Sequence, residues 1–123
     1  MSYNIGDIGH GGIIFFVDSS GEHGLVAAET DQSSASWYFA KGDCSLLELN
    51  GFSDWFLPSK DQLGLMFTNL YRQGLGKFAG EKYWSSTEYD KHTHYAWDQY
   101  FVRGSQTACK KSFYRHVRAA RAF

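Results

Sequence analysis

The chain has 123 residues and a formal net charge of −1, with four Trp, eight Tyr, ten Phe and 13 Gly. This length fits about one domain with its own core, so we expect a single domain over residues 1–123. Large rings and frequent glycines favour a loop-rich α+β or β-rich fold over a helical bundle. A near-neutral charge gives no general attraction to nucleic acid or to anionic membranes.

The longest apolar run, Ile13–Val17, is far too short to cross a bilayer. No charged segment followed by an apolar one opens the chain, so no secretory signal is predicted. We therefore expect a soluble chain with no membrane insertion and no nucleic-acid partner.

The first half predicts two strands and a helix. A continuous apolar run bounded by glycines predicts a strand over 12–17, and GLVAA predicts a second over 24–28, with SSGEHG as the hairpin loop between them. A helix is expected over 35–49. Its expected core residues are Trp37, Phe39, Leu46 and Leu47.

A second helix is predicted over 59–72, because Ser59 and Gln62 form a capping box before apolar residues that recur at spacings of three and four. The remaining pattern predicts a sheet-rich second half. The expected strands cover 82–87, 96–103, 107–113 and 116–123, with turns at Gly80 and Gly104.

Candidate catalytic motifs are weak. The glycine-rich segment Gly6–Gly12 precedes a strand instead of joining a strand to a helix, and it lacks the Lys-Ser/Thr pair of a phosphate-binding loop. Ser85 and Ser86 lack a glycine-flanked nucleophile turn. We therefore predict no catalytic residue and no cofactor.

Candidate metal ligands and cysteine pairs are equally sparse. His92 and His94 would project to one side of a strand, as a metal pair could, but no third ligand stands at a recognisable spacing. Cys44 and Cys109 have no metal-site spacing and are too few for a disulfide framework. We predict no metal site and two unpaired thiols.

Five segments in order along the chain carry a family resemblance: GDIGHGGIIFFVD, HGLVAA, FSDWFLPSKDQL, YWSSTEY and VRAARAF. They resemble the C-terminal domain of the Legionella collagen-like protein and the related Fibrobacter major paralogous domain. The resemblance implies a C-type lectin-like α+β fold, in the variant shared with formylglycine-generating enzymes, with a twisted antiparallel sheet and two helices. It implies binding and no enzymatic activity, because Cys44 and Cys109 offer no equivalent of the cysteine pair in the enzyme branch.

The last third resembles the variable proteins of diversity-generating retroelements, in which a fixed frame alternates with positions diversified by adenine-directed mutation. The implied variable region covers about 89–116. Its implied ligand-binding residues are Asp90, His92, Thr93, His94, Asp98, Tyr100, Arg103, Ser105, Thr107, Ser112, Phe113, Tyr114, Arg115 and His116. The implied scaffold residues are Trp84, Trp97, Gln99, Phe101, Gly104, Gln106, Arg118 and Arg121.

The variable positions are consistent with one template codon. Mutation of the adenines of AAC cannot yield Met, Trp, Gln, Lys or Glu, and none of these five occurs among the implied variable residues. Lys91 and Lys110 depart from this pattern, and Ala120 replaces the usual Val of the closing motif.

Strand periodicity predicts how frame and variable residues share the sheet. With a period of two, Trp97, Gln99 and Phe101 point inward while Asp98 and Tyr100 face out. Exposed aromatic and charged residues then provide the contact chemistry that antibody loops use.

The leading hypothesis is a display domain that binds a protein or glycan on another cell or particle, placed on a cell surface or a phage virion and forming a homotrimer. An alternative is an adhesin for sulfated glycans. Its sulfate-binding residues would be Lys91, Arg103, Lys110, Lys111 and Arg115. The third hypothesis is an oxidase or hydrolase built on the same fold.

Overall fold

Two mostly antiparallel β-sheets form the framework of the domain in the computed structural model, which describes residues 3–123. The four-stranded sheet has the order β1 (Ile8–Gly9), β2 (Gly12–Val17), β3 (Gly24–Ala27) and β9 (Ala120–Ala122). The five-stranded sheet has the order β4 (Ser33–Ala35), β8 (Arg115–Val117), β5 (Lys82–Glu88), β6 (Tyr95–Tyr100) and β7 (Gln106–Lys110). Its β5–β8 pair is parallel.

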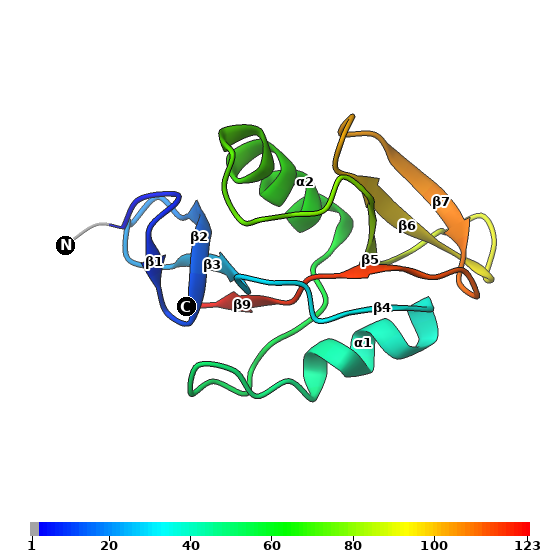
Figure 1. Cartoon of the computed structure of the whole chain (residues 1–123), viewed down its shortest axis with the longest axis horizontal. Helices are drawn as coiled ribbons and strands as arrows, with labels where there is room; N and C mark the ends of the chain where they lie inside the picture. Colours follow the sequence, from blue (N-terminus) through cyan, green and yellow to red (C-terminus); the bar gives the residue numbers. More distant parts are fainter. Residues whose placement is uncertain (1–2) are drawn as a thin grey trace.

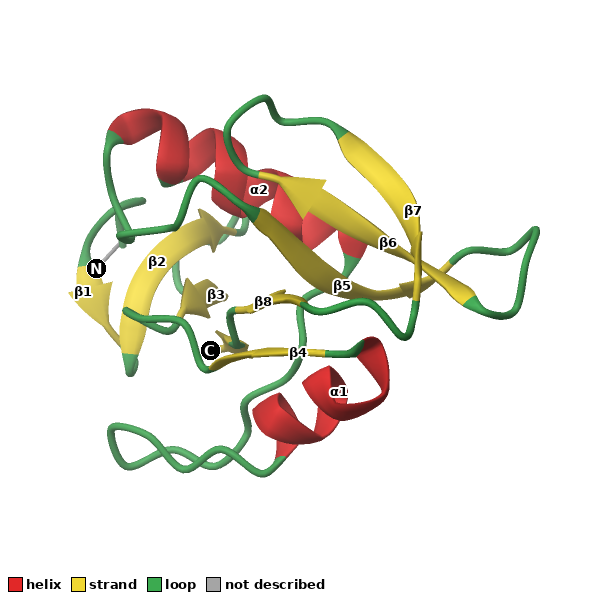
Figure 2. Ribbon diagram, turned by 45° about the vertical axis from the view of Figure 1, so that its right-hand side comes forward, coloured by secondary structure: helices red, strands yellow, loops and turns green. Residues whose placement is uncertain are grey.

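The two helices lie on opposite sides of the sheets, as Figure 1 shows. They are α1 (Trp37–Ser45) and α2 (Lys60–Asn69), and a 3₁₀ turn, η1 (Tyr71–Gln73), follows α2. The hairpin of β6 and β7 extends away from the four-stranded sheet (Figure 2). The predicted α+β class is therefore confirmed, with two helices and two sheets in place of one dominant sheet.

Helix α2 begins where its capping box predicts. The Gln62 N–H donates to Ser59 Oγ (3.1 Å), and the Ser59 N–H donates to Gln62 Oε1 (2.8 Å). Leu63, Met66 and Leu70 recur on one side and are fully buried against the sheets. Local capping and apolar spacing both favour this helix, so the two levels of structure agree.

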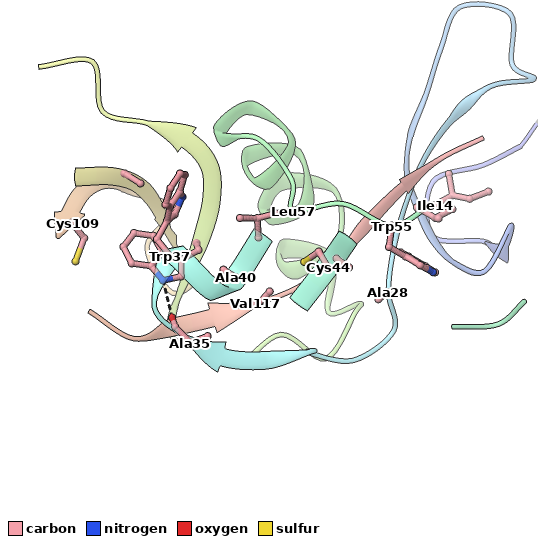
Figure 3. Packing of buried hydrophobic residues seen from close by; sticks show 14 residues of the cluster. Ile14, Ala28, Ala35, Trp37, Ala40, Cys44, Trp55, Leu57, Cys109 and Val117 are labelled. Carbon is pink, nitrogen blue, oxygen red and sulfur yellow. Dashed lines mark hydrogen bonds between the residues drawn. The ribbon is translucent and has the colours of Figure 1, made fainter. Parts of the chain in front are cut away.

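Helix α1 is shorter than predicted, and part of its predicted core is wrong. Trp37, Ala40 and Cys44 form the buried face, and the small Ala40 and Cys44 side chains let the helix lie close to β4 and β8 (Figure 3). Phe39 and Leu46 lie on the other side of the helix and are 68% and 84% exposed. The residues Ser33–Ala35, partly expected in the helix, form β4.

The predicted strand over 116–123 is two strands in two different sheets. β8 pairs with β4 and β5, and β9 pairs with β3. Between them the chain crosses at Arg118 and Ala119, and the crossing is held by the Ala28 N–H, which donates to Ala119 O (2.9 Å). The C-terminal segment therefore joins the two sheets.

Arg118 is fully buried at this crossing. Its Nε donates to Asp31 Oδ1 (2.9 Å), and its Nη1 donates to the carbonyls of Ala28 (2.9 Å) and Gly76 (2.8 Å). The guanidinium carbon lies 4.1 Å from the centroid of the Phe78 ring. One side chain thus connects the end of β3, the loop before β5 and the crossing strand.

The partner carboxylate is shared. Tyr83 donates its hydroxyl to Asp31 (2.8 Å), and the Ala79 N–H donates to that hydroxyl (2.9 Å). Burial, with the Asp31 contact, raises the pKa of Tyr83, so the phenol stays protonated as a donor. His116 Nδ1 lies 3.2 Å from the same carboxylate.

Two hydrophobic clusters fill the space around this network. One lies between α1 and the strands, where Trp84 Nε1 donates to Ala35 O (2.9 Å), the dashed line that ends at Ala35 in Figure 3. The other lies under α2, where Phe101 stacks on Phe78 with ring centroids 4.5 Å apart. Trp84 and Phe101, both expected in the frame, are fully buried.

The other strand predictions hold within a few residues. The strand over 12–17 matches β2, and those over 24–28 and 82–87 match β3 and β5. The strands over 96–103 and 107–113 end earlier, as β6 and β7, because turns follow each. The short strands β1 and β4 were not predicted.

We predict that Arg118→Met lowers the free energy of unfolding by about 3 kcal/mol, because it leaves the Asp31 carboxylate and two buried carbonyls without their donor. Urea denaturation followed by tryptophan fluorescence measures the change. The matched control is Asp54→Asn, which removes the ion pair between Asp54 and Arg121. The side chain of Asp54 is 60% exposed. That control should change stability by less than about 1 kcal/mol, and equal losses in both variants would contradict the assignment.

Candidate functional site

The implied ligand-binding residues lie mostly on the surface of the β5–β6 loop, the β6–β7 hairpin and the segment 111–115. We call this region the display surface. Its exposed members are Asp90, His92, Thr93, His94, Arg103, Ser105, Thr107, Ser112, Phe113 and Tyr114. Tyr100, Arg115 and His116 are half-buried, and Asp98 is buried.

The implied scaffold residues show the opposite distribution. Trp84, Gln99, Phe101 and Arg118 are buried. Trp97, Gly104, Gln106 and Arg121 are half-buried. Most of the implied ligand-binding residues are therefore exposed and none of the implied scaffold residues is, although half-buried residues occur in both sets and Asp98 is buried.

The side of β6 that faces α2 carries the frame residues. Gln106 Nε2 donates to Gln99 Oε1 (2.9 Å) and to the Lys60 carbonyl (2.8 Å). Lys60 Nζ lies 3.6 Å from the centroid of the Trp97 ring. These contacts join the β6–β7 hairpin to the start of α2.

Gly104 completes the frame at the turn between β6 and β7. Its φ of +78° lies in the left-handed region, and a Cβ there would stand 2.6 Å from the Phe67 ring. Only glycine fits both demands.

Asp98 is not outward, contrary to the prediction. It lies on the side of β6 opposite Gln99, but Arg115, the first residue of β8 in the same sheet, extends its side chain across β5 onto that side. Arg115 Nε donates to Asp98 Oδ2 (3.0 Å), and Thr107 Oγ1 donates to Asp98 Oδ1. The side chain of Asp98 is 0% exposed.

Two open hollows indent the display surface. The first, the arginine hollow, has a volume of about 400 Å³ and is lined by Ser34, Glu81, Lys82, Tyr100, Tyr114, Arg115 and His116. The second, the histidine hollow, has a volume of about 590 Å³ and is lined by Tyr38, His92, His94, Tyr95, Lys110 and Ser112. The residues Ser112 and Tyr114, one on each hollow, belong to the same short segment.

The two histidines lie in the loop before β6, outside the strands that the sequence predicts. The His94 N–H donates to His92 Nδ1 (3.2 Å), so a neutral His92 carries its proton on Nε2. Within residues 3–123, no group of three or more His, Cys, Asp or Glu side chains is arranged to hold a metal ion.

Lys111 is buried and fixes the loops around the histidine hollow. Its Nζ donates to the Thr93 carbonyl (2.7 Å) and to Glu88, and lies 4.3 Å from the centroid of the Trp37 ring. Its backbone N–H donates to His94 O (2.8 Å). Lys111 therefore connects α1, the β5–β6 loop and the segment after β7, and its ammonium is not free to meet a sulfate.

The side chains of Cys44, Cys109 and Ser85 are buried in the core or hydrogen-bonded to the backbone. Both cysteines are free thiols. Burial raises the pKa of Cys44 to about 12, and it raises the pKa of Cys109 against the opposing effect of the Arg115 charge. Ser85 Oγ donates to the Trp97 carbonyl (2.7 Å).

Sequence reasoning missed several residues that line the hollows: Ser34, Tyr38, Glu81, Lys82 and Tyr95. One signal was available. Three aromatic residues in succession, Trp37, Tyr38 and Phe39, cannot all face the core from one helix, since neighbours on a helix point about 100° apart. Tyr38 is 59% exposed and reaches the display surface from α1.

These features define an α+β domain of two helices and two mostly antiparallel sheets, with an open surface built by loops at one end. The chain matches the Lcl C-terminal domain over residues 19–121, so it belongs to that family. A search of curated proteins gives no match. Neither α-helix of the described chain is long and apolar enough to cross a membrane.

The Lys111–Glu88 pair predicts a pH dependence of stability. The hydrogen bond from Lys111, with its charge, lowers the pKa of Glu88 below the ordinary value of 4.5. Because the folded pKa lies below the unfolded one, the stabilisation is complete above about pH 4.5 and is lost as the pH falls through the folded pKa. The Tm difference between the natural protein and Glu88→Gln should therefore be present at about pH 6 and shrink progressively as the pH is lowered below the ordinary pKa of 4.5. A difference that stays constant across this range would contradict the prediction.

Proposed function

We propose that this domain is a ligand-display module that binds a protein or glycan on another cell or particle through the display surface. The observation that carries the proposal is that ten of the fourteen implied variable residues are exposed, whereas none of the eight implied frame residues is. On a sheet edge that is merely solvated, there is no reason for the exposed positions to coincide with those whose residues can arise from the implied template codon. Binding, not catalysis, is the role that it supports.

The chemistry of the surface suits recognition of a large partner. Phe113 and Tyr114 are 51% and 67% exposed, and Tyr38 adds a third large ring. Tyr114 lines the arginine hollow and Tyr38 lines the histidine hollow, and each hollow also contains histidine, lysine and hydroxyl groups. Rigid aromatic anchors next to adaptable polar groups are typical of diversified binding surfaces, where affinity is spread over a patch.

The finer family assignment belongs to the same proposal. We infer a C-type lectin-like fold of the formylglycine-generating-enzyme variant, diversified by a retroelement and shared with the Fibrobacter major paralogous domain. The strand-and-loop display surface, opposite the frame that packs on α2, supports that inference. Placement on a cell surface or phage virion, as a homotrimer, is the setting in which such a surface would meet a partner.

Binding to sulfated glycans receives less support. Lys111 is buried, and Arg115 is paired with Asp98. Lys91 and Lys110 lie at one end of β6, whereas Arg103 lies in the turn at the other end. The basic groups are therefore too dispersed to act together on one sulfate.

We predict that the triple variant Tyr100→Ala, Phe113→Ala, Tyr114→Ala abolishes ligand capture and shifts Tm by less than about 4 °C. Arg115 is left intact because its loss would leave Asp98 buried and unpaired. Binding is measured with fluorescently labelled protein on a panel of bacterial cells, phage particles and immobilised glycans. A folded triple variant that still binds as the natural protein does would refute the proposal.

The matched control replaces three exposed apolar residues far from the display surface, Ile8, Leu46 and Leu75, with Ala. This control should retain binding, which separates the display surface from general surface hydrophobicity. Addition of about 0.5 M salt tests the sulfated-glycan alternative, because contacts with sulfate weaken steeply as charges are screened.

The diversification part predicts a genomic arrangement. A near-copy of the coding segment for about residues 89–123 should lie beside a reverse-transcriptase gene and differ from it almost only at adenines. Comparison of the two DNA segments checks this. Differences spread evenly over the four bases would remove the diversification claim and leave the binding claim standing.

A further inference from the structure

The Asp98 carboxylate is the one member of the predicted variable set, among residues 3–123, whose side chain is fully buried. Both oxygens have donors, Thr107 Oγ1 for Oδ1 and Arg115 Nε for Oδ2. A buried carboxylate without its cationic partner is strongly destabilising, so this pairing constrains where Arg115 can lie.

Arg115 in turn holds the tip of the display surface. Its Nη1 donates to the Tyr114 carbonyl (3.0 Å), and its guanidinium carbon lies 5.6 Å from the centroid of the Phe113 ring. Its Nη2 lies 3.1 Å from Cys109 Sγ and covers a thiol that is only 8% exposed. The guanidinium therefore touches the sheet with one part and the exposed aromatic segment with the other.

The backbone of this segment adds the bond from the Phe113 N–H to the Lys110 carbonyl (3.0 Å). Phe113 and Tyr114 themselves are exposed, so burial of their rings does not fix them. Side chains anchor the segment at both ends, Lys111 at the start and Arg115 at the end, and the position of the Arg115 guanidinium, next to the two exposed rings, depends on Asp98.

We propose that Asp98 is a positioning residue of the display surface: it does not touch the ligand but fixes, through Arg115, the conformation in which Phe113 and Tyr114 are presented. The inference rests on the proposed function, because positioning matters only if this surface binds. A change at the buried position 98 would then alter the presented surface as much as a change at an exposed position does.

The first test uses a nanobody selected on the natural protein and mapped to the segment tip by its failure to bind Tyr114→Ala. The nanobody cannot reach Asp98, yet Asp98→Asn should weaken its Kd about tenfold or more. Asp54→Asn, which breaks the ion pair with Arg121 elsewhere on the molecule, should leave the Kd unchanged. In an Arg115→Gln background, Asp98→Asn should have no further effect, because its action passes through Arg115.

The second test measures thiol labelling by DTNB. Asp98→Asn should speed the labelling of Cys109 about tenfold by local release of Arg115, while fully buried Cys44 keeps its slow rate and reports global opening. Arg115→Lys, which keeps the charge but loses the guanidinium contacts, should also speed the labelling of Cys109.

Three outcomes would overturn the inference: an unchanged nanobody Kd in Asp98→Asn, equal acceleration of both thiols, or full additivity of the two substitutions. Because the nanobody is a chosen probe, these results do not depend on the natural partner. If the proposed function itself were wrong, the aromatic triple variant would bind cells or glycans as the natural protein does.

Discussion

The buried charge of Arg118 is the constraint on which the two-sheet arrangement depends. A guanidinium with no exposed surface must find acceptors for its donors, and it finds them on two segments that are distant in sequence: Ala28 and Asp31 after β3, and Gly76 before β5. These acceptors converge at the point where the C-terminal segment leaves β8 and enters β9. Hydrophobic burial alone would not specify that crossing, because either sheet could accept an apolar strand there, whereas the charge has one satisfactory position.

The display surface is supported by the same kind of device at a smaller scale. Lys111 is buried as Arg118 is, and it connects the β5–β6 loop to Trp37 and to the chain after β7. The amide pair of Gln99 and Gln106 anchors the other side of the hairpin to the start of α2. The frame thus depends on polar side chains with defined hydrogen-bond geometry. Exposed neighbours such as Thr93 and His94 take part in these bonds only through their backbone carbonyls, so their side chains can change with little cost in stability.

Local signals predicted those parts of the fold that local interactions determine. Ser59 and Gln62 give the start of α2, and the apolar run from Ile13 to Val17 gives β2. The failures arise where distant segments decide. The sequence pattern predicts one continuous strand over 116–123. In the structure, Arg118 donates to Asp31 and Gly76, and the chain passes from one sheet to the other at this residue. Phe39 has the large apolar side chain of a core residue, yet the face of α1 that is buried is the one with the small residues Ala40 and Cys44.

Asp98 shows why the site could be predicted only in part. Strand periodicity places it on the side opposite Gln99, and this is correct. Whether that side meets water depends on a side chain 17 residues later and on another strand, about which periodicity within β6 carries no information. The Arg115 side chain, which extends from β8 over the sheet, pairs with Asp98 at a position that is buried and makes a charge there dependent on a charge elsewhere. The positions of the display surface are therefore not independent of one another. The buried Asp98 carboxylate limits which residues can stand at positions 107 and 115, because both supply its donors.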